Sequence, residues 1–109
     1  MALCARKDVP VQETWDLSLI FAEESQMWEA LDALKKQVRT FVETYAGKLT
    51  TAEKIVACLD EQEAFLPTMG NIWSYTGLAV EADYTDNALR ERNEKIGDEM
   101  TRQIGRAHV

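Results

Sequence analysis

The chain has 109 residues and a formal net charge of −7, and 46% of its residues are hydrophobic and 28% charged. This length accommodates one small domain, and the composition is that of a globular protein rather than a disordered one. The negative charge would repel a phosphate backbone, and no cluster of Lys or Arg offsets it. We therefore expect no nucleic-acid partner.

The cellular location follows from the N-terminus and the cysteines. Residues 1–15 carry charged and polar side chains where a secretory signal would need an apolar stretch, and no later segment is apolar enough to span a membrane. Cys4 and Cys58 lie far apart without CxxC spacing, which favours free thiols, with a structural disulfide as the alternative. We expect a cytoplasmic protein with no membrane partner.

Residues 1–23 are expected to form an N-terminal lead-in. The first 13 have no apolar period and contain Pro10, so they should be ordered only where they lie against something else. The following residues 14–21 place Trp15 and Phe21 around short polar side chains, which predicts a single turn anchored to the core by both aromatic rings.

The next segment, 24–46, gives the strongest helical signal. Its apolar residues alternate steps of four and three along one face of a helix: Met27, Leu31, Leu34, Val38, Phe41 and Tyr45. Gly47 follows the last of them, at the place where a left-handed residue usually ends a helix.

Two further helices are expected over 51–60 and 62–82. Thr50 and Glu53 have capping-box spacing, and the apolar face of the first helix is expected from Ile55, Val56 and Leu59. The acidic residues 60–63 either continue that helix or mark a break. Pro67 and Gly70 predict a kink within the second helix. The residues of this helix that are expected to face the core are Phe65, Met69, Ile72, Trp73, Thr76, Ala79 and Val80.

A last helix is expected over 86–102, capped by Thr85 or Asp86. Its inward candidates are few: Ala88, Leu89, Ile96 and Met100. No segment alternates with a period of two, and no Asn-Gly or Asp-Gly turn occurs. The predicted fold class is all-α, an antiparallel bundle of about four helices with an extended N-terminal lead-in.

The sequence contains no complete catalytic site. Its only histidine is His108, so the two-histidine HExxH zinc motif cannot be formed. A distributed site of Cys4, Cys58 and His108 has no support from spacing. Carboxylate pairs are abundant, but on helices that also carry lysines they are usually solvated. We assign no catalytic, cofactor-binding or metal-binding residue; the carboxylates considered are Glu23, Glu24, Asp60, Glu61 and Glu63.

The tryptophans Trp15, Trp28 and Trp73 allow two interpretations, as core residues or as a peptide-binding surface. Tryptophan is more often buried, which favours the core. Trp73 and Tyr75 project in different directions from one helix, so one of them should lie near a rim.

Several segments together resemble one enzyme family. They are Trp15-Asp16-Leu17-Ser18 through Phe21, the helix ending in Tyr45-Ala46-Gly47-Lys48-Leu49, and Trp73-Ser74-Tyr75 with Leu78, leading to Ala82-Asp83-Tyr84-Thr85-Asp86. Over residues 6–103, their order and spacing resemble the N-terminal region of oligoendopeptidase F-type zinc metallopeptidases. Leu19 and the stretch 67–70 depart from the pattern of that family.

The resemblance implies a truncated enzyme. The HExxH helix, the zinc and the catalytic domain would lie downstream, and residues 24–103 would be the helical domain that forms part of a cap over the cleft for oligopeptide substrates. Zinc would belong to the full-length parent and not to this chain. Such a fragment would be inactive alone, and we expect it to self-associate through apolar surface that the missing part would cover.

The last residues, 104–109, read Ile-Gly-Arg-Ala-His-Val. They match a translation of the widely used short-read sequencing adapter ATC GGA AGA GCA CAC GTC, so we expect a non-native tail. The alternative to a truncated peptidase is a free-standing helical module for protein interaction or homodimerisation.

Overall fold

The computed structural model describes residues 4–108, and all of their regular structure is helical. Three short 3-10 helices, η1 (Arg6–Asp8), η2 (Val11–Glu13) and η3 (Leu17–Leu19), form the lead-in. They are followed by α1 (Glu24–Tyr45), α2 (Ala52–Glu63), α3 (Leu66–Ala82) and α4 (Asn87–Arg106). The expectation of an all-α fold is confirmed.

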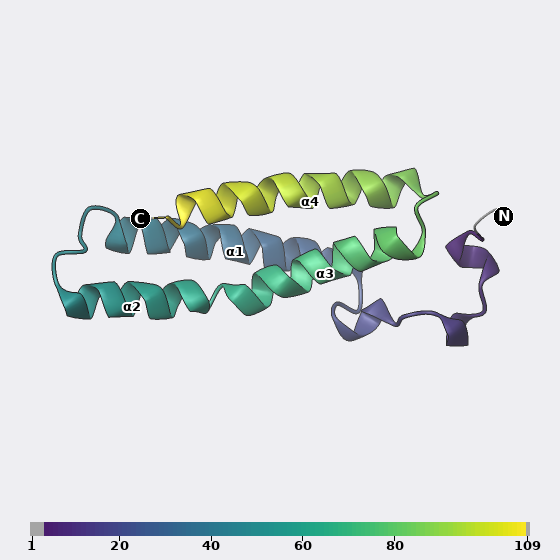
Figure 1. Ribbon diagram of the computed structural model, residues 1–109, viewed down its shortest axis with the longest axis horizontal. Helices are drawn as coiled ribbons and strands as arrows, with labels where there is room; N and C mark the ends of the chain where they lie inside the picture. Colours follow the sequence, from purple (N-terminus) through teal and green to yellow (C-terminus); the bar gives the residue numbers. More distant parts are fainter. Residues whose placement is uncertain (1–3, 109) are drawn as a thin grey trace.

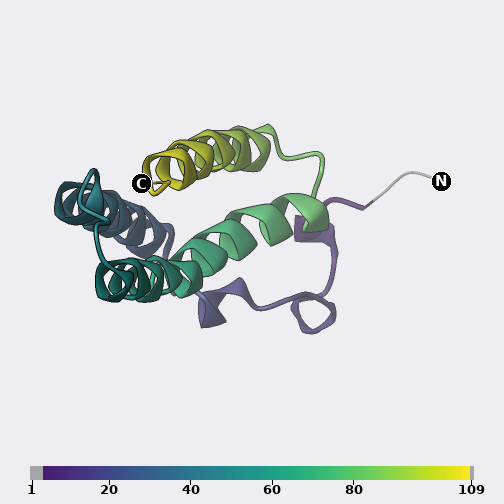
Figure 2. The same ribbon diagram turned by 60° about the vertical axis from the view of Figure 1, so that its left-hand side comes forward.

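The helices lie along one another in an elongated body with principal extents of 59 × 24 × 22 Å. Only Ala64 and Phe65 separate α2 from α3, and the two helices follow one another along one side (Figure 1). The body therefore has three rods, which are α1, α2 followed by α3, and α4. Figure 2 shows these rods together with the lead-in, which comes back to the C-terminal end of α3.

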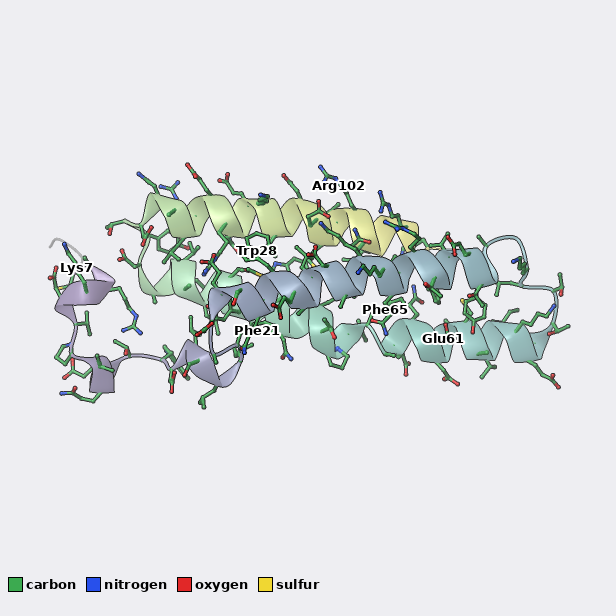
Figure 3. The ribbon with its side chains drawn as sticks, turned by 180° about the vertical axis from the view of Figure 1, so that it is seen from behind. Lys7, Phe21, Trp28, Glu61, Phe65 and Arg102 are labelled. Atoms are coloured by element: carbon green, nitrogen blue, oxygen red, sulfur yellow. The ribbon has the colours of Figure 1, made fainter. Side chains whose placement is uncertain are left out.

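The core forms around α1, whose six predicted inward residues are all buried. Phe41 and Phe65 meet edge-on with their ring centroids 5.2 Å apart, and Phe65 lies at the joint between α2 and α3 (Figure 3). Gly47 has a φ of 70°, which confirms the left-handed residue expected after α1. The first helix was thus predicted correctly.

The predicted capping and facing of α2 are wrong. Thr51, not Thr50, caps the helix, and its hydroxyl accepts a hydrogen bond from the Lys54 backbone N–H at 3.2 Å. Cys58 is the buried residue of α2, because α2 packs against α1 along the side that carries Cys58. The residues expected inside are 44–56% exposed; they are Ile55, Val56 and Leu59.

The predicted kink is instead a break. Residues 62 and 63 belong to α2, and α3 begins at Leu66, so Pro67 lies in the first turn of a new helix. Proline is tolerated there because the first N–H groups of a helix have no intrahelical partner. Of the inward candidates, Phe65, Ile72, Thr76 and Val80 are buried, whereas Trp73 is exposed.

The last helix is longer than expected. Asp86 caps α4 by accepting a hydrogen bond from the Leu89 N–H at 3.2 Å, and the helix continues to Arg106 rather than ending at 102. Ile96 and Met100 are fully buried as expected, whereas Ala88 is exposed. Gln103 and Ala107 are buried as well, and so the last turn of α4 packs against the body.

Candidate interaction surface

The side chains considered for a metal site are not gathered together. Cys4 is exposed in the lead-in, whereas Cys58 is buried on α2. Cys58 and His108 line the same hollow of about 370 Å³, which also contains Leu59 and Gln62. Among residues 4–108, no three His, Cys, Asp or Glu side chains are placed to hold a metal ion.

The acidic residues considered as acid/base pairs are exposed. Glu24 forms an ion pair with Arg92, with the Oε1 and Nη1 atoms 3.2 Å apart. Asp60, Glu61 and Glu63 lie on the last turn of α2, and Glu61 is seen on that helix in Figure 3.

The tryptophans do not form the core that was predicted. Trp15 is 79% exposed and Trp73 is 48% exposed, whereas Trp28 packs against the core with Lys95 Nζ 5.5 Å from its ring. Extended backbone at Thr14 and Asp16 carries Trp15 outward. The other predicted anchor is confirmed, because Phe21 meets Tyr75 edge-on at 5.4 Å.

An open groove runs along the side of the body between α3 and α4. Its apolar part, of about 480 Å³, has Val38 of α1 among its lining residues. The α3 side contributes Leu66, Met69 and Trp73, and the α4 side contributes Ile104. We call this feature the α3–α4 groove.

A second, more polar hollow of about 410 Å³ continues the groove past Trp73, which lines both parts. Ser74, Glu81, Tyr84 and Asn93 line this end. The α3–α4 groove therefore extends from the joint between α2 and α3 to the turn before α4, with an apolar centre and a polar end.

The sequence carries a signal for this surface that the helical stripe alone does not reveal. Residues 66–80 contain no charged side chain, although 28% of the whole chain is charged. A helix that faces water on one side normally carries charges there. The uncharged outer side of α3 is thus the feature that could have predicted an interaction surface.

The lead-in is fixed to the turn between α3 and α4. The Arg6 backbone N–H donates to Asp83 Oδ2 at 3.1 Å, and the Thr85 N–H donates to Asp83 Oδ1 at 3.0 Å. Hydrogen bonds from the Thr85 side chain and from the Arg6 backbone hold the pKa of Asp83 below its usual value. The ionised carboxylate of Asp83 therefore holds the backbone of Arg6 in place.

Arg92 joins three parts of the body. Its side chain is only 11% exposed, its guanidinium carbon lies 5.1 Å from the Tyr75 ring centroid, and it pairs with Glu24 of α1. Among residues 4–108, the buried Arg92 Nε has no hydrogen-bond partner. Phe21 also contacts Tyr75, and so Arg92 and Phe21 both pack against this ring at the lead-in end of the core.

No helix among the described residues is both long enough and apolar enough to cross a membrane. Comparisons of the chain with protein-family models, curated proteins and solved structures find no match.

Proposed function

We propose that this chain is a non-catalytic helical segment of an oligoendopeptidase F-like zinc metallopeptidase, in which it forms part of the cap over the oligopeptide-binding cleft. The proposal includes the finer fold expected from the sequence, an antiparallel bundle of about four helices in which α2 and α3 count separately. Zinc and the catalytic residues would be supplied by the downstream domain.

The observation that carries this proposal is the exposed apolar surface of α2 and the lead-in. Ile55, Val56 and Leu59 are about half exposed, and Val11 and Leu19 are 81% and 85% exposed. Exposed apolar side chains that lie together, as Ile55, Val56 and Leu59 do on α2, usually mark a contact with another part of a protein. A downstream catalytic domain would be such a contact.

The test is to read the same locus from an independent sample with long reads. The proposal expects the frame to depart from Ile104 onward and to continue into a segment that encodes HExxH. A natural stop codon directly after Val109, found in native DNA without adapter sequence, would refute both the truncation and the non-native tail.

A second candidate function is a free-standing helical interaction module, and the α3–α4 groove favours it. The groove is built entirely from residues of this chain and needs no further domain to be formed. Purification of the native protein from its own cells distinguishes the two candidates, because the first expects a much longer chain and the second a chain of this size with a bound partner.

A further inference from the structure

We propose that the α3–α4 groove binds a basic amphipathic helix of another protein, which lies along α3 and completes the body as a further rod. This inference rests on the second candidate function, the interaction module, and gives that module a ligand class.

The shape of the α3–α4 groove suits a helix. It extends along α3 from Leu66 to Glu81, about 22 Å or four turns of α-helix, and Glu63 lies beyond it at the end of α2. A Cβ added at Gly70 in this groove would meet no atom within 4 Å, so nothing blocks the approach of a backbone there. The axes of helices that pack side by side lie about 8–10 Å apart. A small residue such as Gly70 allows a second helix to come this close.

The centre of the groove provides apolar contacts for such a helix. Leu66 is 62% exposed and Trp73 is 48% exposed, and Met69 lies between them in sequence. Half-exposed tryptophan and adaptable methionine side chains are typical of surfaces that bind amphipathic helices. No charged residue of α3 interrupts this surface, because residues 66–80 carry none.

Charge selects the kind of helix. Glu63 and Glu81 are the only charged residues that line the two parts of the groove, and they lie toward its opposite ends. Neither takes part in an ion pair within the described chain. A helix with Lys or Arg near both ends would pair with these carboxylates, and the net charge of −7 would attract it at longer range. The same charge opposes a second copy of the acidic chain as the occupant.

The experiment uses a labelled synthetic helix of about 18–20 residues, with leucines along one face and lysines near both ends. A second peptide has glutamate in place of every lysine, and a third has the first composition in scrambled order. Binding to the full chain is followed by fluorescence anisotropy at about 50 mM and about 300 mM salt. The proposal expects the lysine helix to bind at least about tenfold more tightly than either control peptide.

Two pairs of matched variants locate the site. Trp73→Ala should weaken binding of the lysine helix about tenfold, whereas Trp15→Ala, which removes an even more exposed tryptophan from the lead-in, should leave binding unchanged. The double change Glu63→Gln and Glu81→Gln should weaken binding about three- to tenfold and reduce its salt dependence. The double change Glu43→Gln and Glu53→Gln alters the net charge equally but lies outside the groove, and so it should change binding much less.

Several outcomes would overturn the proposal. Equal effects of the two tryptophan variants, or of the two charge variants, would mean non-specific attraction to an acidic protein. No binding of the lysine helix at about millimolar concentration would also refute it. If sedimentation shows a dimer that Trp73→Ala dissociates, the occupant is a second copy; the interaction module then stands and this ligand class fails. Leu66→Gln provides a second groove variant if Trp73→Ala loses its helical circular dichroism.

Discussion

The Arg6 backbone N–H donates a hydrogen bond to the Asp83 carboxylate across 77 positions of the chain, at a distance of 3.1 Å. This contact fixes the start of the lead-in to the turn between α3 and α4, while Phe21 fixes its end against Tyr75. The segment between these two points is exposed and includes Val11, Trp15 and Leu19. The lead-in is therefore a loop that is attached at both ends.

Replacement Asp83→Asn should release the start of this loop. The amide nitrogen of asparagine cannot accept a hydrogen bond, so either the Arg6 N–H or the Thr85 N–H loses its acceptor. Hydrogen exchange should show faster exchange at residues 5–9 and unchanged exchange in α1. Asp86→Asn is the matched control, because asparagine is an equally good N-cap for α4.

The same contact should depend on pH. Because the pKa of Asp83 is lowered in the folded chain, the ionised carboxylate stabilises the fold at pH values above its unfolded pKa of about 4. This contribution is lost as the pH falls through the lower folded value. Protection from exchange at residues 5–9, relative to the intrinsic rate at each pH, should therefore fall below pH ~4 in the native chain and show no such transition in Asp83→Asn; an identical pH profile in both would contradict the assignment.

Replacement Arg92→Ala should lower the free energy of unfolding by about 1–3 kcal/mol, because it removes the contact with the Tyr75 ring and the ion pair with Glu24. Arg90→Ala changes the same helix at an exposed position, and its effect should stay within about 0.5 kcal/mol. Urea unfolding followed by circular dichroism measures both. Equal effects would show that Arg92 contributes no more than a surface arginine.

Replacement Phe41→Ala should cost about 3–5 kcal/mol, since this ring is 2% exposed and meets both Tyr45 and Phe65. Folded domains are stable by only about 5–15 kcal/mol, so this variant should melt far below the native chain or be unfolded at room temperature. Leu59→Ala, at a position that is 54% exposed, should melt close to the native chain. A large loss in Leu59→Ala would show that α2 buries its outer side in solution.

The two thiols should react at very different rates with a thiol reagent such as Ellman's reagent. Cys4 is exposed and should react at once, whereas Cys58 is 5% exposed between α1 and α2 and should react only when α2 opens. Mild urea should accelerate the slow phase before α1 unfolds. In Cys4→Ser only the slow phase should remain; a fast full reaction of that variant would show that α2 is detached.

The purified chain should neither retain one equivalent of zinc after dialysis nor cleave a quenched fluorescent peptide above the blank. The physical reason is that residues 4–108 place no group of three ligands together. Metal analysis and fluorimetry with and without a chelator provide the measurement. Chelator-sensitive cleavage that co-purifies with the chain through two columns would contradict the proposed non-catalytic role.

The sequence predicted α1 well because its apolar residues form a single stripe that has one possible inward side. The predicted burial of Ile55, Val56 and Leu59 was wrong. The short helix α2 packs mainly against α1, so only one side of it can be buried. The prediction that Trp15 anchors the lead-in to the core was also wrong, because the general tendency of tryptophan to be buried does not determine where the backbone of the lead-in runs. The uncharged run 66–80 signals an interaction surface on α3, but the shape of the α3–α4 groove depends on how the two helices pack, which a local pattern does not determine.

The break at Ala64 and Phe65 has a consequence for how the chain tolerates changes in length. In an uninterrupted helix, one inserted residue rotates every later side chain by about 100° and would turn the buried side of α3 toward water. Ala64 and Phe65 both keep right-handed helical dihedrals, so the winding of the backbone continues through the joint and a residue inserted in α2 would still rotate α3. The length of α2 is therefore tied to the register of α3, and Cys58 and Phe65, which are both buried, keep the two helices in phase with the core.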